Sequence, residues 1–89
     1  MDNFIDHAFD ELKDEIEGAC EYLNQADNAE AQGHHYLAMG LHHIAKDEYT
    51  HANFLRDYLI SKKVYHESER HKALEERWHK LRGRLGLES

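Results

Sequence analysis

The stretch LAMGLHHIAKDEYTHANFLRDYL, residues 37–59, decides the fold of this chain. Its apolar residues recur every three or four positions, which is typical of a helix with one buried face. The members of this stripe are Leu37, Leu41, Ile44, Ala52, Leu55 and Leu59. Because successive helical residues are about 100° apart, Glu48 falls at the centre of the stripe and His51 at its shoulder. We therefore predict a helix over about residues 34–62 whose apolar face carries a carboxylate and an imidazole.

A similar stripe precedes this helix, over about residues 2–31, and has Glu15 at its centre. Its members are Phe4, Ala8, Leu12, Ala19, Tyr22, Leu23 and Ala26. Gly33 is suited to end this helix, and the short turn there predicts an antiparallel hairpin. Glu15 lies 17 residues before Gln32 and Glu48 lies 15 residues after Gly33, so the two carboxylates should meet at the same depth.

A third amphipathic helix is predicted over about residues 67–84. Its apolar positions, Leu74, Trp78, Leu81 and Leu85, are spaced by four and three residues, and we expect this seam to join separate chains. The chain contains no proline. The predicted fold class is all-α, with an antiparallel helical hairpin (1–64) followed by a C-terminal amphipathic helix and short tail (65–89).

The two carboxylates on apolar stripes point to a metal. Burying an ionised carboxylate costs several kcal/mol unless it is paired, and neither stripe contains Lys or Arg. A Glu on one helix and Glu-x-x-His on the next form half of the ligand set of a di-iron carboxylate bundle. A chain of 89 residues buries little core by itself, so a second copy would supply the other half and complete a four-helix bundle. Carboxylate and imidazole donors favour iron, with manganese as the second choice.

Charge and composition argue against several classes of function. Residues 1–61 carry 13 acidic and 3 basic side chains, a balance of −10, whereas residues 62–89 carry 5 and 8, a balance of +3. The acidic body disfavours nucleic acid, and no apolar run approaches the roughly 20 residues of a membrane span. Cys20 is the one cysteine, so no internal disulfide can form. With no signal-peptide pattern at the N-terminus, we expect a cytoplasmic protein. The other histidines are expected on the surface, and Cys20 on the surface or at an interface.

The segment Glu15-Ile-Glu-Gly-Ala-Cys-Glu-Tyr22 and the motif Glu48-Tyr-Thr-His51 together resemble the ferritin-like superfamily. Because one helix pair is present instead of two, the chain looks most similar to the encapsulated ferritin (half-ferritin) family, over about residues 8–62. The resemblance implies metal ligands at Glu15, Glu48 and His51, and Tyr22 as an aromatic hydrogen-bonding residue beside them. It also implies a homodimer or larger even-numbered oligomer and a ferroxidase site shared by two subunits.

For this family the resemblance further implies iron storage or detoxification, and residence as cargo in an encapsulin shell, a protein nanocompartment. The family's shell-docking tail is matched here only faintly by Leu85-Gly86-Leu87-Glu88-Ser89. Three alternatives stay open. The same ligands could serve a rubrerythrin-like peroxidase or oxygen scavenger, or a metal buffer or sensor without catalysis. A metal-free helical interaction module would instead satisfy its Glu residues with water or a partner's Arg.

Overall fold

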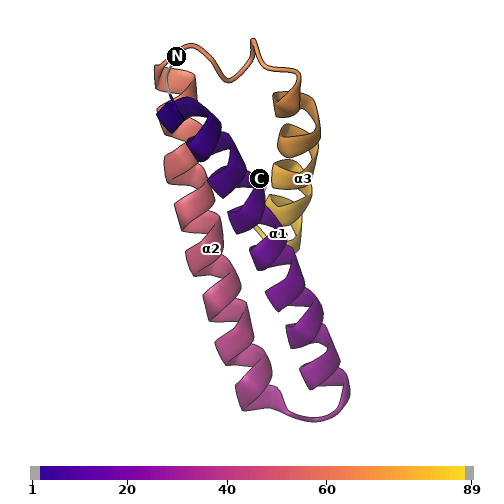
Figure 1. The fold of residues 1–89 in the computed structure, drawn as a ribbon. Helices are drawn as coiled ribbons and strands as arrows, with labels where there is room; N and C mark the ends of the chain where they lie inside the picture. The colour runs from indigo at the N-terminus through magenta and orange to yellow at the C-terminus, as the bar shows by residue number, and fades with distance from the viewer. Residues whose placement is uncertain (1–2, 88–89) are drawn as a thin grey trace.

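The computed structural model describes residues 3–87, and within this range the chain consists of three helices and no strand (Figure 1). They are α1 (Asn3–Ala31), α2 (His35–Ser61) and α3 (Arg70–Arg84). The all-α prediction is thereby confirmed, although α3 begins three residues later than residue 67. Residues 1–2 and 88–89, the outer ends of the predicted first helix and of the tail, lie outside the described range. None of the helices described has the length and hydrophobicity that crossing a membrane requires.

A short turn joins α1 to α2 in an antiparallel hairpin (Figure 1). The N–H of His34 donates to the carbonyl of Ala29 at 2.8 Å, and that of Gly33 to the carbonyl of Glu30 at 3.0 Å. This pair of bonds is a Schellman motif, which needs a left-handed residue after the helix. Gly33 supplies it, with φ of 83°, as the sequence predicts.

The core lies between the two long helices and beneath α3. Tyr65, Leu12, Ile16, Leu59 and Leu81 are its largest fully buried side chains. The apolar residues of α3 belong to this same core, because Leu74, Trp78, Leu81 and Leu85 are all buried within the chain. The expectation that this seam joins separate chains is therefore wrong. The seam packs instead on the hairpin to which it is covalently connected.

Three arginines hold α3 beside α1, and they are spaced by seven residues. Their partners on α1 follow in the same chain order, so α3 runs parallel to α1 (Figure 1). The pairs are Arg70–Asp10 at 2.6 Å, Arg77–Glu17 at 3.0 Å and Arg84–Asp27 at 3.3 Å. Each pair is largely exposed, so each contributes little stability by itself, but together they fix the register of α3.

A half-buried polar cluster holds α3 against α2. Arg56 donates two hydrogen bonds to the carboxylate of Glu75, and the hydroxyl of Tyr65 donates a third. The guanidinium of Arg56 also lies 4.0 Å from the centre of the Trp78 ring. Burial alone would raise the pKa of Glu75, but the hydrogen bonds from Arg56 and Tyr65 outweigh it and hold this pKa below its ordinary value.

Several large apolar side chains of the hairpin are exposed to solvent in the single chain. We call this surface the open face; it comprises Phe4, Leu37, Ile44 and Phe54, which are 75, 57, 40 and 73% exposed. The sequence placed Phe4, Leu37 and Ile44 on buried stripes, and within a single chain this prediction is wrong. The buried residues of α2 are Ala38, Ala45, Tyr49, Ala52 and Leu59. The buried arc of α2 is therefore rotated toward α3, and one edge of each predicted stripe remains uncovered.

Candidate metal centre

Glu15 of α1 and Glu48 and His51 of α2 converge midway along the hairpin. One donor atom from each residue lies within 4.8 Å of the other two, and Nδ1 of His51 is 3.4 Å from Oε2 of Glu15. With metal–ligand bonds of about 2.0–2.2 Å, donors on one ion lie about 3–4 Å apart. Small side-chain rotations would therefore bring all three donors onto one divalent cation.

Glu15 carries an unsatisfied acceptor at the centre of this cluster. Its side chain is 19% exposed, and its Oε2 atom is buried without a hydrogen-bond donor. A buried polar atom left unpaired costs about 1–3 kcal/mol, and more when it is charged. In residues 3–87, no Lys or Arg forms an ion pair with Glu15 or Glu48. The ion-pair partner given for this oxygen among residues 3–87 is Nδ1 of His51, at 3.4 Å, which is charged only when the imidazole is protonated.

The electrostatics of Glu48 also favour a positive charge close to the two carboxyl groups. Burial raises the pKa of the Glu48 carboxyl above its ordinary value, and the neighbouring Glu15 carboxyl raises it further. The nearby His51 opposes this shift of the Glu48 pKa without cancelling it. Two carboxyls held this close repel each other when both are ionised, so the pair takes up positive charge readily, either as a proton or as a metal ion.

The three predicted ligands are thus brought together, but not at the depth that the sequence predicts. The sequence placed Glu15 and Glu48 in the middle of buried stripes. In the structure both are half-buried, and His51 is 59% exposed. Tyr22, which the resemblance places beside the metal, is half-buried against the hydrophobic core. The cluster therefore lies at the border between the core of the chain and its solvent-exposed surface.

Gly18 borders this cluster, although the sequence patterns did not predict it. It lies one turn after Glu15 on α1, and a Cβ atom built on it would be 3.0 Å from Oε2 of Glu48. The carboxylate of Glu48 therefore rests against the backbone of α1 at a position without a side chain. A glycine inside a helix, three residues after a candidate ligand, was the signal that could have identified it.

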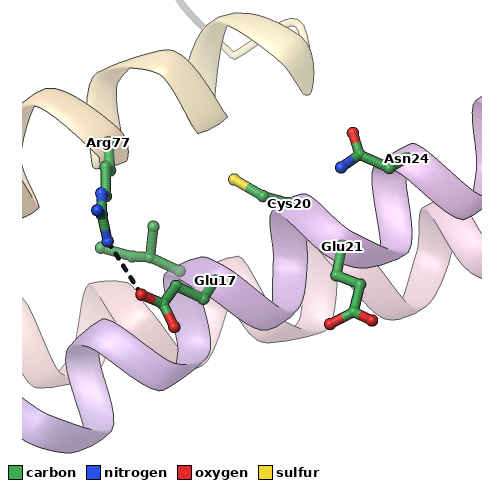
Figure 2. Close-up of a pocket in the computed structure, with 6 residues that line it drawn as sticks. Glu17, Cys20, Glu21, Asn24 and Arg77 are labelled. Carbon is green, nitrogen blue, oxygen red and sulfur yellow. Dashed lines mark hydrogen bonds and ion pairs between the residues drawn. The ribbon is translucent and has the colours of Figure 1, made fainter.

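A hollow between α1 and α3 contains Cys20 (Figure 2). It has a volume of about 390 Å³ and is lined by Ile16, Glu17, Cys20, Glu21, Asn24 and Arg77. Figure 2 shows the ion pair between Arg77 and Glu17 at one end of this hollow and the thiol of Cys20 pointing toward α3. Cys20 is half-buried in this hollow, and the sequence expected it on the surface or at an interface. Among residues 3–87, those that line the hollow include no histidine that could act as a base for the thiol.

The remaining histidines show two kinds of environment. His34, His35 and His43 are exposed near the turn of the hairpin, as the sequence predicts. His66 and His71 instead form an edge-to-face pair, 5.3 Å between ring centres, beside Tyr65. Nδ1 of His71 forms a hydrogen bond with the carbonyl of Ser68 at 2.6 Å. The pair therefore joins the segment before α3 to the first turn of α3.

Comparison of the chain with models of protein families, with curated proteins and with solved structures gave no match. The residues of the site therefore carry the functional argument.

Proposed function

We propose that this chain is a ferritin-like di-iron ferroxidase, in which two copies bind iron between them through Glu15, Glu48 and His51 and oxidise Fe(II). One observation carries the proposal. Two carboxylates and an imidazole from adjacent helices converge, and one carboxylate oxygen is buried with no donor. The resemblance of the two helical motifs to the ferritin-like superfamily supports the same assignment.

The donor set fits iron. Each chain offers two carboxylates and one imidazole, and oxygen and nitrogen donors of this kind suit Fe(II) or Mn(II). Two chains bring four negative charges, which balance two divalent cations. Three ligands from one chain do not fill the coordination sphere of an ion, so positions remain for the partner's carboxylates and for an oxidant.

The open face supports the second copy as the source of the missing ligands. At about 100° per residue, His51, Leu37 and Ile44 fall on one face of α2, and Leu37 and Ile44 are 57 and 40% exposed. Exposed apolar side chains gathered on one face mark an association surface. A second hairpin packed there in the manner of a four-helix bundle would cover these residues and place a second Glu–Glu–His cluster against the first.

In this proposal the iron supplies the electrons, and the protein side chains hold the iron. Each Fe(II) gives up one electron, so a pair supplies the two electrons that reduce O2 to hydrogen peroxide, with two protons, or peroxide to water. Glu15 and Glu48 would hold the irons and would stabilise the higher charge of Fe(III), while His51 would supply a nitrogen ligand. Storage of the product requires an enclosure, for which we propose a larger even-numbered assembly of the chain or an encapsulin-type shell around it.

The test is an anaerobic titration of Fe(II) into metal-free protein, followed by native mass spectrometry and then by addition of O2 or peroxide. We expect two irons to appear together on an even-numbered oligomer and to be oxidised when O2 is admitted. The matched variants are Glu15→Gln, which should abolish binding, and Glu21→Gln, an equal change at an exposed position of the same helix, which should preserve it.

Other outcomes identify the rival functions. Turnover with peroxide but not with O2 would favour a rubrerythrin-like peroxidase, and iron binding without turnover would favour a metal buffer or sensor. A wild-type protein that binds no iron and keeps its oligomeric state would leave the metal-free interaction module.

A further inference from the structure

Gly18 occupies a position where the chain needs space rather than flexibility. Its φ is not positive; within residues 3–87 the positive φ values belong to Gly33, Lys63 and Gly86. Gly18 lies near the middle of α1, where glycine is among the least favourable helix residues. An alanine would suit the backbone conformation better, so the reason for a glycine here must lie in what surrounds it.

The surroundings of Gly18 differ from those of the other helical glycines. A Cβ atom built at Gly18 would lie 3.0 Å from Oε2 and 3.8 Å from Cδ of Glu48, whereas one built at Gly40 or Gly83 would meet nothing within 4 Å. A contact of 3.0 Å is closer than a methyl group and a carboxylate oxygen normally approach. The missing side chain of Gly18 is therefore the space that the Glu48 carboxylate occupies.

We propose that Gly18 is a positioning residue of the metal centre, which lets the Glu48 carboxylate lie against α1 beside Glu15 and His51. This inference rests on the proposed function, because it assigns Gly18 a role through a ligand of that centre. The methyl group of an alanine would push the carboxylate away by a few tenths of an ångström. The fold tolerates such a shift, since the carboxylate is the end of a flexible side chain, but metal ligation depends on distances held to about 0.2 Å.

The substitution Gly18→Ala separates these two effects. We expect the metal-free variant to keep its helical circular dichroism and to unfold at the same Tm as the wild type or a higher one, because alanine is the better helix former. Co(II), used as the probe ion, should bind roughly tenfold more weakly, which is the scale of effects from residues that orient ligands. The visible absorption bands of bound Co(II) should also shift, because they report the ligand geometry. Gly83→Ala, on α3 with open space around it, is the matched control and should leave both the Co(II) affinity and the Co(II) absorption bands unchanged.

The outcomes distinguish this inference from the proposed function. If wild-type protein binds Co(II) and Gly18→Ala binds it with the same affinity and spectrum, the positioning role of Gly18 is wrong while the metal centre stands. A lower Tm of the metal-free Gly18→Ala protein would also overturn the inference, since the methyl would then disturb helix packing as a whole. If the wild type binds no Co(II) and no Fe(II), the proposed centre fails and the inference with it.

Discussion

Nε1 of Trp78 donates a hydrogen bond to Oδ1 of Asn53 at 2.8 Å, which joins the middle of α3 to the middle of α2. Both partners lie inside one chain, and the Trp78 side chain is 6% exposed. A helix that the sequence suggested for contact between chains is thus part of the core of its own chain. The position of α3 in turn decides which side of the hairpin is left open.

Substituting Asn53 by alanine should destabilise the chain. The buried indole N–H of Trp78 would lose its acceptor, at a cost of about 1–3 kcal/mol. The measurement is urea unfolding followed by fluorescence of Trp78, which is the one tryptophan of the chain. Asn28→Ala, at an exposed position of α1, serves as the control, and equal unfolding midpoints for the two variants would contradict the prediction.

The cluster around Glu75 should make stability depend on pH. The pKa of Glu75 is lowered in the folded chain, so its stabilising effect is present above its unfolded pKa of about 4.5 and is lost as the pH falls through the folded value. Glu75→Gln should lower the free energy of unfolding at pH 7 by about 1.5–3 kcal/mol, because hydrogen bonds to a charged group are weakened. The difference from wild type should shrink toward pH 3. Glu76→Gln, at a side chain 69% exposed, should have little effect at either pH.

In the metal-free protein, the ionised Glu48 carboxylate should destabilise the fold, whereas the ionised Glu75 carboxylate stabilises it. The pKa of Glu48 is raised in the folded chain, so its favourable contribution is present below the unfolded pKa and is lost as the pH rises through the folded one. Glu48→Gln should therefore raise the Tm of metal-free protein at pH 7 and lose this advantage near pH 4. Adding Fe(II) anaerobically should reverse the order, because wild type gains binding energy that the variant lacks. A Tm for Glu48→Gln that is lower than wild type without metal would contradict this prediction.

A charge on the open face should prevent association without unfolding the chain. Leu37 is 57% exposed, so Leu37→Arg removes little core packing but places a cation where the proposed second copy would bury it. Sedimentation velocity should show wild-type dimers or larger even-numbered assemblies and a monomeric variant with unchanged helical circular dichroism. Ala73→Arg, at an exposed position of α3, is the control. A monomeric wild type at all concentrations would refute the shared site.

The sequence predicted the helices and the meeting of the three candidate ligands because both depend on local spacing. Periodicity fixes which residues share a face, Gly33 fixes the turn, and equal depth from that turn brings Glu15 opposite Glu48. These relations need no knowledge of a third element, and the structure confirms them.

The sequence could not predict which neighbour covers each face. The spacing of Leu74 and Trp78 is the same whether α3 packs on its own hairpin or on another chain. The stripe of α2 was also too wide for one neighbour to cover, so Leu37 and Ile44 remain exposed once α3 takes the other edge. The sequence did not predict the contact of Gly18 with Glu48, because this contact depends on the conformation of the Glu48 side chain, which spacing alone does not give.

The ordered pairing of Arg70, Arg77 and Arg84 with α1 has an electrical consequence for the whole molecule. It places the basic residues of α3 on one side of a hairpin whose residues 1–61 carry a balance of −10. The charge of the chain is therefore unevenly distributed, with an acidic hairpin and a basic C-terminal segment. Such a field attracts small cations toward the hairpin before they reach any ligand. Its reach is about 10 Å at 0.1 M salt, so cation capture by the isolated chain should slow as ionic strength rises.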